Sequence, residues 1–361
     1  MQGSADSRPL RIAVAGVGSF SQRVLIPGLV ACPHAEVVAL FGPTREKTER
    51  IARERGIPRA YADYERMLDE SEPEAVVIAT PNDVHYPMVM AALARRLHVL
   101  CEKPLGVNVA QAREMAAAAR AAGVRTAVNF TYRSTNPMRH LARLIEQGRL
   151  GTLYHFSISF WQNLRTDAAA PLAYRMLRER GGGALLDIGV HLADLIRWWF
   201  GEIEAVCGVT HIAIGERPAP SGGRGRVTAD DTASFVVRLP SGVAGTVQVS
   251  QVATGRQNYR RVELFGSHGA LMMEEDRTVA PVVRAAGPGE PALQVEPLPD
   301  DLNVAFDDFP RFHLTRIVAA LRGEPNGWPT FADGLRAQQV VEAVEQSWQT
   351  ERWIRLQPPD Q

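Results

Sequence analysis

The sequence is poor in cysteine, has no excess of charge of one sign and contains no long apolar run. Its 361 residues include three cysteines, Cys32, Cys101 and Cys207, without a CxxC pair or a metal-ligand spacing. So small and odd a set is typical of reduced thiols in a cytosolic protein. Lys plus Arg and Asp plus Glu each number 40. This balance argues against nucleic acid and against an anionic membrane as the main partner, because both need a basic excess.

Membrane and export signals are also missing. No stretch approaches the ~20 uninterrupted apolar residues that span a bilayer, and the polar segment 1–9 lacks the apolar core of a signal peptide. We therefore expect a cytoplasmic globular protein without a membrane partner. At ~100–200 residues per domain, the length predicts two domains.

The first 130 residues alternate apolar strands with helical segments. Strands are predicted at 10–15, 36–41, 75–79, 98–101 and 126–130, and helices at 22–31, 45–55, 64–69, 87–96 and 109–122. Such alternation implies an α/β domain in which helices cover both faces of a parallel sheet.

After residue 130 we place a second α/β domain, 131–361, with a large and mostly antiparallel sheet. Its strands are predicted at 154–161, 233–239, 245–252 and 261–265, with helices at 185–200 and 331–348. The last helix can pack back on the first domain. The segment 215–226, rich in Gly, Pro and Arg, is predicted to be a mobile loop, and 277–302 to be irregular.

A glycine turn follows the first strand. Gly16 and Gly18 begin a G-x-G-x-x-S pattern that ends at Ser21, immediately before a helix. The first glycine permits the tight turn, and the second lets a pyrophosphate approach the backbone. The helix start, which includes Ser19 and Phe20, supplies free N–H groups and the positive end of the helix dipole. The motif alone is weak, but its place at the head of a strand–helix series favours a dinucleotide site.

The second strand is followed by a basic loop in place of an acid. An Asp or Glu there would bind the ribose hydroxyls of NAD, but Gly42 occupies that position. Thr44, Arg45 and Lys47 lie just beyond and suit a 2′-phosphate, so NADP is favoured over NAD. The alternative is that Arg45 and Lys47 are ordinary solvated charges on a surface helix and have no part in cofactor binding.

Two further strand-end turns carry candidate side chains. Ligands of open α/β sheets bind outside the carboxyl ends of the strands, where the third and fourth predicted strands end. Thr80, Pro81, Asn82 and His85 are therefore candidates for the cofactor, although Asn82 or His85 could instead cap the next helix. Glu102 and Lys103, before Pro104, are candidates by the same geometry, and Pro104 can follow a cis peptide bond.

Lys103 could stabilise negative charge that develops on a substrate oxygen. The alternative is a surface lysine in a turn.

Asp187, His191 and Asp194 stand at i, i+4 and i+7 in the apolar helix 185–200 and so share one of its faces. A polar stripe on so apolar a helix needs partners or lines a cleft. His191 is a natural general acid or base, and Asp187 could bind a substrate hydroxyl or orient the histidine, whereas Asp194 suits a structural role. A satisfied core histidine and a metal site are the alternatives, but no further His, Cys or Asp cluster completes a metal site.

Together these motifs resemble the glucose–fructose oxidoreductase, inositol dehydrogenase and rhizopine-catabolism family of oxidoreductases (Gfo/Idh/MocA). The resemblance runs nearly end to end and rests on AGVG at 15–18, VIATPNDVH at 77–85, VLCEKPL at 99–105, GGALLDIGVH at 182–191 and FADGLRA at 331–337. It implies a Rossmann dinucleotide-binding domain in 1–130 and a substrate-binding and oligomerisation domain in 131–361. A homodimer or homotetramer is expected.

The resemblance also implies the chemistry. The expected reaction transfers a hydride between NAD(P) and a secondary alcohol or ketone of a sugar, polyol or related small molecule. Lys103, Asp187 and His191 are the implied catalytic residues, which also contact the substrate with Arg133. Trp161 is a further candidate for the substrate pocket. A redox-assisted glycoside-cleaving enzyme with recycled cofactor and a non-catalytic NAD(P)-binding metabolite sensor are the alternatives.

Overall fold

The computed structural model describes residues 8–358, so most of the polar segment 1–9 lies outside the described residues. The chain divides into two compact units. The first takes in the chain up to Gly106, Ala110–Thr131 and Val304–Gly334, and the second takes in Val107–Val109, Tyr132–Asn303 and the chain from Leu335. The second domain predicted at 131–361 is thus interrupted, because 304–334 packs in the first unit.

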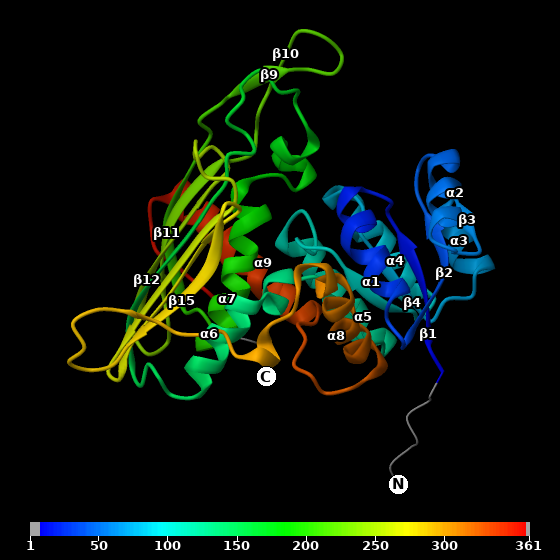
Figure 1. Cartoon of the computed structure of the whole chain (residues 1–361). Coiled ribbons are helices and arrows are strands. Elements are labelled where there is room, and N and C mark those ends of the chain that lie inside the picture. Colours follow the sequence, from blue (N-terminus) through cyan, green and yellow to red (C-terminus); the bar gives the residue numbers. More distant parts are fainter. Residues whose placement is uncertain (1–7, 359–361) are drawn as a thin grey trace. The chain divides into compact units, whose positions relative to one another are not determined.

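The first unit is built on a six-stranded parallel sheet of order β3-β2-β1-β4-β5-β6 (Figure 1). The strands are β1 (Leu10–Ala15), β2 (Ala35–Phe41), β3 (Ala60–Tyr61), β4 (Ala75–Ile78), β5 (His98–Cys101) and β6 (Thr126–Val128). The order reverses direction between β1 and β4. This is the switch point at which open α/β sheets bind ligands at the strands' carboxyl ends.

Helices complete this unit. They are α1 (Ile26–Val30), α2 (Arg45–Glu54), α3 (Tyr64–Glu70), α4 (His85–Ala94), α5 (Val109–Ala122) and α8 (Phe309–Arg322). A π-helical turn, η1 (Ser21–Leu25), precedes α1, so the predicted single helix 22–31 begins with a wider turn. Leu25 and Leu29 pack in one core with Leu314 and Ile317 of α8. Burial of this apolar face stabilises α8 in the first unit.

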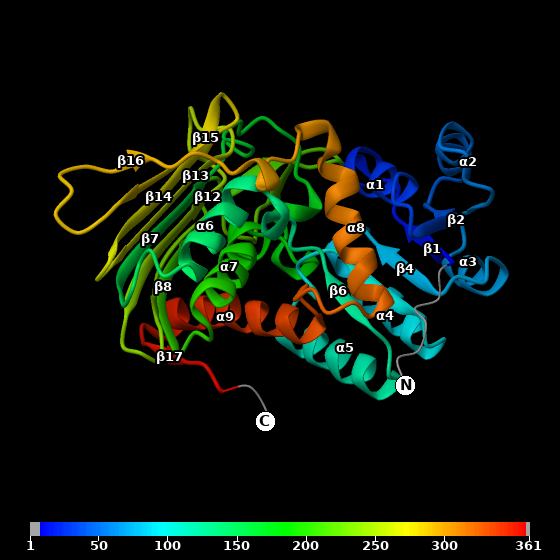
Figure 2. The same cartoon turned by 60° about the horizontal axis from the view of Figure 1, so that its bottom comes forward.

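The second unit contains a nine-stranded sheet of order β16-β15-β14-β13-β7-β12-β11-β8-β17 (Figure 2). Its strands are β7 (Leu153–Trp161), β8 (Ala205–His211), β11 (Thr232–Arg238), β12 (Ala244–Ser250), β13 (Tyr259–Gly266), β14 (Gly269–Asp276), β15 (Val279–Ala286), β16 (Gln294–Val295) and β17 (Ile354–Arg355). Neighbours pair antiparallel except β7 with β12. Phe156, Ile158 and Phe160 alternate into the core, which confirms the predicted mostly antiparallel sheet with one covered face.

The helices of the second unit are α6 (Asn136–Glu146), α7 (Val190–Phe200) and, from Leu335 onward, α9 (Phe331–Thr350). The predicted helix 185–200 is a π-helical turn, η6 (Leu185–Gly189), continued by α7. No helix within residues 8–358 has the length and apolar character needed to cross a membrane.

Two predictions about loops are wrong. The segment 277–302 contains β15, and 215–226 forms the hairpin of β9 (Glu216–Pro218) and β10 (Arg224–Arg226). Arg217 is 1% exposed and donates to the backbone oxygens of Asp167 and Arg165, both at 2.5 Å. Its guanidinium therefore holds the hairpin in place.

Candidate active site

The glycine turn is shaped by two close approaches and one open space. Gly16 has φ +112°, and a β-carbon there would lie 2.3 Å from the carbonyl oxygen of Ala79 at the end of β4. A β-carbon on Gly18 would meet nothing within 4 Å. The turn is open on this side, next to exposed Ser19, so a ligand can approach its backbone. Ser21, which replaces the usual third glycine, is 1% exposed and packs inside.

A side chain at position 42 would press on its neighbours. A β-carbon on Gly42 would lie 2.6 Å from both Oγ1 of Thr48 and Cγ2 of Val17. Thr48 is fully buried and donates to the backbone oxygen of Thr44 at 2.9 Å. A larger residue at position 42 would therefore require Thr48 of α2 or Val17 of the glycine turn to shift.

The polar side chains of the segment after β2 are exposed to solvent. Thr44 precedes α2 in an extended conformation, and its side chain makes no capping hydrogen bond. Arg45 pairs with Glu49 at 2.8 Å across an exposed face. Lys47 is also exposed. This hydroxyl and these two cations stand at the amino end of α2, a position that favours an anion.

His85 is fully buried beneath the turns that follow β4 and β5. Its Nδ1 lies 2.9 Å from the backbone oxygen of Pro104, and its Nε2 lies 3.1 Å from that of Thr80. Asn82 is 3% exposed. His85 thus joins the two turns on which the predicted cofactor residues stand.

Lys103 and Pro104 are joined by a cis peptide bond, as the sequence allowed. The N–H of Lys103 donates to Oε2 of Glu102 at 3.3 Å, and the amide of Asn129 donates to Oε1 of the same carboxylate. Asn129 directly follows β6 and is fully buried. The turn that carries Lys103 is therefore tied to the end of the neighbouring strand.

In the second unit, Asp187 is held by two donors. Nε2 of Gln251 and Nη1 of Arg175 each lie 2.8 Å from a different oxygen of its carboxylate. The side chain of Asp187 is 18% exposed and that of Arg175 is 45% exposed. These two hydrogen bonds orient the carboxylate.

His191 lies in the first turn of α7 and is 5% exposed. Its ring packs on that of Tyr132, with centroids 4.3 Å apart. The guanidinium of Arg260 lies over the ring of Tyr132, 4.6 Å from its centroid. Burial raises the pKa of Tyr132, so its hydroxyl stays neutral beside the histidine.

Arg133 is committed to Asp194. Two of its nitrogens donate to the two oxygens of that carboxylate at 2.8 and 2.7 Å, and both side chains are buried. Asp194 thus has the structural role expected of it, whereas substrate binding by Arg133 stays a prediction.

The comparisons with known proteins agree in family. A model described as the oxidoreductase family with an NAD-binding Rossmann fold matches residues 10–130, and the GFO/IDH/MocA C-terminal domain matches 138–272. An oxidoreductase domain protein from Kribbella flavida has a solved structure with TM-score 0.88 and 30% identity, covering 97% of this chain and 100% of that one. The chain belongs to the Gfo/Idh/MocA family of oxidoreductases.

One relative and one solved structure carry the name of the same activity. Levoglucosan dehydrogenase of Pseudarthrobacter phenanthrenivorans is 28% identical over an alignment of 353 residues that covers 90% of each protein. A structure of levoglucosan dehydrogenase in complex with NADH and levoglucosan has TM-score 0.86 and 25% identity, covering 97% of this chain and 100% of that one. This Gfo/Idh/MocA chain is thus an enzyme of the NAD(P)-dependent oxidoreductase class.

Trp161 lies apart from the His191 stack. It pairs with Tyr259 across the strands and stacks on its ring at 5.2 Å. Phe160, one residue earlier, packs on Tyr132 at 5.5 Å. Successive side chains of a strand point to opposite faces, so the indole and the His191 stack lie on different faces of the sheet. The structure does not bring Trp161 to the other predicted substrate residues of this unit.

Four residues of the site were not predicted from the sequence. They are Asn129, Tyr132, Arg175 and Gln251. Asn129 and Tyr132 flank the end of a predicted strand, so their position was a usable signal. Arg175 and Gln251 stand 12 and 64 residues from Asp187, and neither spacing predicts a contact with it.

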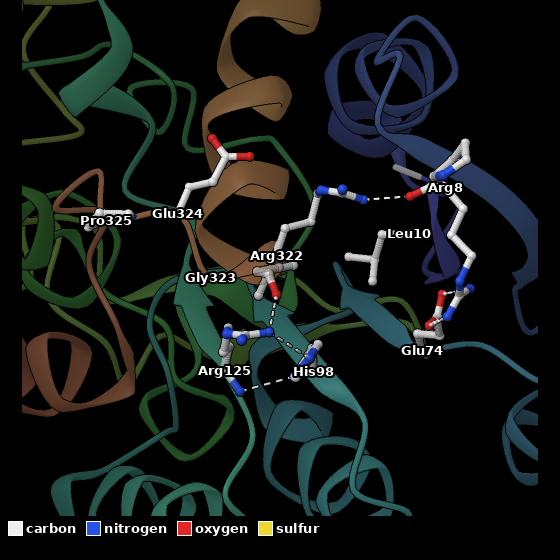
Figure 3. Close-up of a pocket in the computed structure, with 11 residues that line it drawn as sticks. Arg8, Leu10, Glu74, His98, Arg125, Arg322, Gly323, Glu324 and Pro325 are labelled. Atoms are coloured by element: carbon white, nitrogen blue, oxygen red, sulfur yellow. Dashed lines mark hydrogen bonds and ion pairs between the residues drawn. The ribbon is translucent and has the colours of Figure 1, made fainter. Parts of the chain in front are cut away.

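A cavity of about 480 Å³ in the first unit lies at the wrong end of the sheet for this chemistry (Figure 3). Its lining includes Leu10 and His98, the first residues of β1 and β5. Figure 3 shows Arg8 paired with Glu74 on one side and Arg125 beside His98 on the other. Parallel strands place their carboxyl ends at the opposite edge, so this cavity is not the cofactor site. Among residues 8–358, no group of three or more His, Cys, Asp or Glu side chains could hold a metal ion.

Proposed function

We propose that this enzyme transfers a hydride between NADP and a secondary alcohol or ketone of a sugar or polyol. The family and the activity named for levoglucosan dehydrogenase support the substrate class. The observation that carries the proposal is the buried His191, one helical turn after a carboxylate held by Gln251 and Arg175. A buried imidazole on the same helical face as an oriented carboxylate suits proton transfer.

In the oxidising direction, His191 takes the proton from the substrate hydroxyl. Lys103 stabilises the developing alkoxide through its positive charge. Asp187, whose carboxylate is already oriented, binds a neighbouring substrate hydroxyl or holds the imidazole. The bound nicotinamide supplies the hydride acceptor at its C4.

The preference for NADP rests on position 42 and the loop after it. Position 42 is glycine, so the usual carboxylate partner of an NAD ribose is absent, and a larger side chain there would press on Thr48 and Val17. Thr44, Arg45 and Lys47 offer a hydroxyl and two cations at the start of α2. These groups suit a 2′-phosphate, whereas the relative named above was solved with NADH.

The first test is a fluorescence titration of the purified protein with NADPH and with NADH. We expect tighter binding of NADPH, and we expect Arg45→Ala with Lys47→Ala to weaken NADPH alone. Binding of neither nucleotide would overturn the proposal. Tighter binding of NADH would overturn the NADP preference and leave the dehydrogenase reaction standing.

The second test is turnover with a panel of sugars, polyols and anhydrosugars. His191→Ala should lower kcat by ~10²–10⁴-fold with nucleotide binding unchanged, because general acid–base catalysis contributes about that factor. Full turnover by this variant would remove His191 from the reaction. Light scattering of the same samples tests the expected homodimer or homotetramer.

A further inference from the structure

A buried histidine that the proposed reaction does not use lies in α8. His313 is fully buried, with its ring parallel to that of Phe309 at 5.4 Å and edge-on to Trp328, also at 5.4 Å. Burial, with a smaller contribution from nearby Arg316, lowers the pKa of His313 to about 3. The ring is therefore neutral at working pH and carries one N–H.

The position of that proton follows from the hydrogen bonds around Asn129. Nε2 of His313 lies 2.7 Å from Oδ1 of Asn129, while Nδ2 of Asn129 faces Oε1 of Glu102. A carboxylate only accepts, so the NH₂ of Asn129 must face Glu102 and its oxygen must face the ring. His313 consequently donates through Nε2, and the chain of donors has a single direction, from His313 to Asn129 to Glu102.

The far end of this chain is the turn that holds Lys103. Oε2 of Glu102 accepts from the N–H of Lys103 at 3.3 Å, and the N–H of Glu102 donates to the backbone oxygen of Ile78 at 2.9 Å. Glu102 therefore stands at the carboxyl end of β5, beside β4. Asn129 holds one oxygen of its carboxylate, so the orientation of that carboxylate depends on the orientation of the asparagine.

We propose that His313 is a positioning residue: through Asn129 it fixes the carboxylate of Glu102 and the Lys103 turn on which the nicotinamide nucleotide binds. This inference rests on the proposed function. A histidine that only filled the core would not need a donor aimed at Asn129. A buried asparagine has to satisfy its oxygen as well as its NH₂, and His313 does so from a helix 184 residues away.

The test measures the affinity of the wild type and of each variant for one reduced nucleotide, NADPH or NADH, whichever the wild type binds more tightly. His313→Phe keeps a ring against Phe309 and Trp328 but removes the donor, and it should weaken binding about tenfold. His313→Gln, which can supply an N–H of its own, should stay within about threefold of wild type. Ile317→Ala, a fully buried residue of the same helix, is the matched control and should lower Tm without changing the affinity.

A second background shows whether the effect passes through Glu102. In Glu102→Ala, the additional change His313→Phe should produce no further loss of affinity. A further tenfold loss there would overturn the inference, as would wild-type affinity in His313→Phe alone. If His313→Phe does not fold, Asn129→Ser replaces it, because serine is too short to reach both partners and should also weaken binding about tenfold. Unchanged affinity in Asn129→Ser would overturn the inference.

The result for the wild type separates this inference from the proposed function. If the wild type binds neither nucleotide, both are overturned. If it binds one and the affinity is insensitive to His313, only the positioning role is lost. A kinetic readout adds to this: the KM for the nucleotide should rise in His313→Phe and be restored in His313→Gln.

Discussion

The guanidinium of Arg133 and the carboxylate of Asp194 form a buried bidentate ion pair, with side chains 9% and 1% exposed. The guanidinium also lies 5.3 Å from the ring centroid of Trp198. The pair links the segment after the first unit's last strand to the middle of α7. This geometry gives the arginine a part in the stability of the helix that carries His191.

Arg133→Ala should lower the free energy of unfolding by about 3–5 kcal/mol, because it leaves the Asp194 carboxylate buried without its charge partner. Urea denaturation monitored by circular dichroism measures the loss. The control is the paired change Arg133→Met with Asp194→Leu, which removes both charges and should restore most of the stability. If that double variant is stable but has lost affinity for the substrate, the arginine binds substrate after all.

Gln251→Leu should lower kcat by roughly 10–100-fold, since a hydrogen bond to a charged group contributes about 1.5–3 kcal/mol and here it orients Asp187. Nucleotide affinity should not change. Gln248→Leu, at an exposed position of β12, the strand that directly precedes Gln251, is the matched control and should behave as wild type. Equal kcat in the two variants would show that the orientation of Asp187 does not matter for turnover.

Substitutions of Gly18 and Gly42 should have different effects, the first on nucleotide affinity and the second on stability. Gly18→Ala places a methyl in open space, so stability should change by less than about 0.5 kcal/mol while nucleotide affinity falls at least tenfold. Gly42→Ala drives a methyl against Thr48 and Val17 and should lower stability by about 1–3 kcal/mol. Thermal unfolding with nucleotide titration distinguishes them, and full affinity in Gly18→Ala would contradict the assignment of the pyrophosphate to this turn.

Asp230 should make stability fall as pH rises from about 4 to about 7. Burial is the largest cause that raises the pKa of Asp230 from 3.8 to about 7, so over this range the folded state binds more protons than the unfolded state. Its contribution is complete below pH 3.8 and is lost as pH rises through the folded-state pKa, by up to about 4 kcal/mol.

Asp230→Asn isolates this effect, because the asparagine oxygen can still accept from the N–H of Leu185, as Asp230 does at 2.9 Å. The variant should show a flatter dependence of unfolding free energy on pH and greater stability than wild type at pH 8. Identical pH dependence in the two proteins would show that Asp230 titrates as an ordinary carboxyl.

The strand and helix pattern of the first unit could be read locally, with the return of α8 as the exception. Helix 109–122 and strands 10–15 and 98–101 have the bounds that periodicity and turn residues predicted. The helix at 309–322 went unpredicted although it completes the core of that unit. This helix belongs to the first unit because it packs against α1, and no local sequence pattern predicts that contact.

The sequence by itself determined the family, the two kinds of sheet, the turns that carry Gly16 and Lys103 and the helix that carries His191, because periodicity and short motifs are local properties of the chain. The tertiary structure alone decided which polar side chains are committed to one another. His313 and Asn129 are 184 residues apart, and Gln251 and Asp187 are 64 residues apart. Burial makes such pairings obligatory, but folding, and not spacing along the chain, selects the partners.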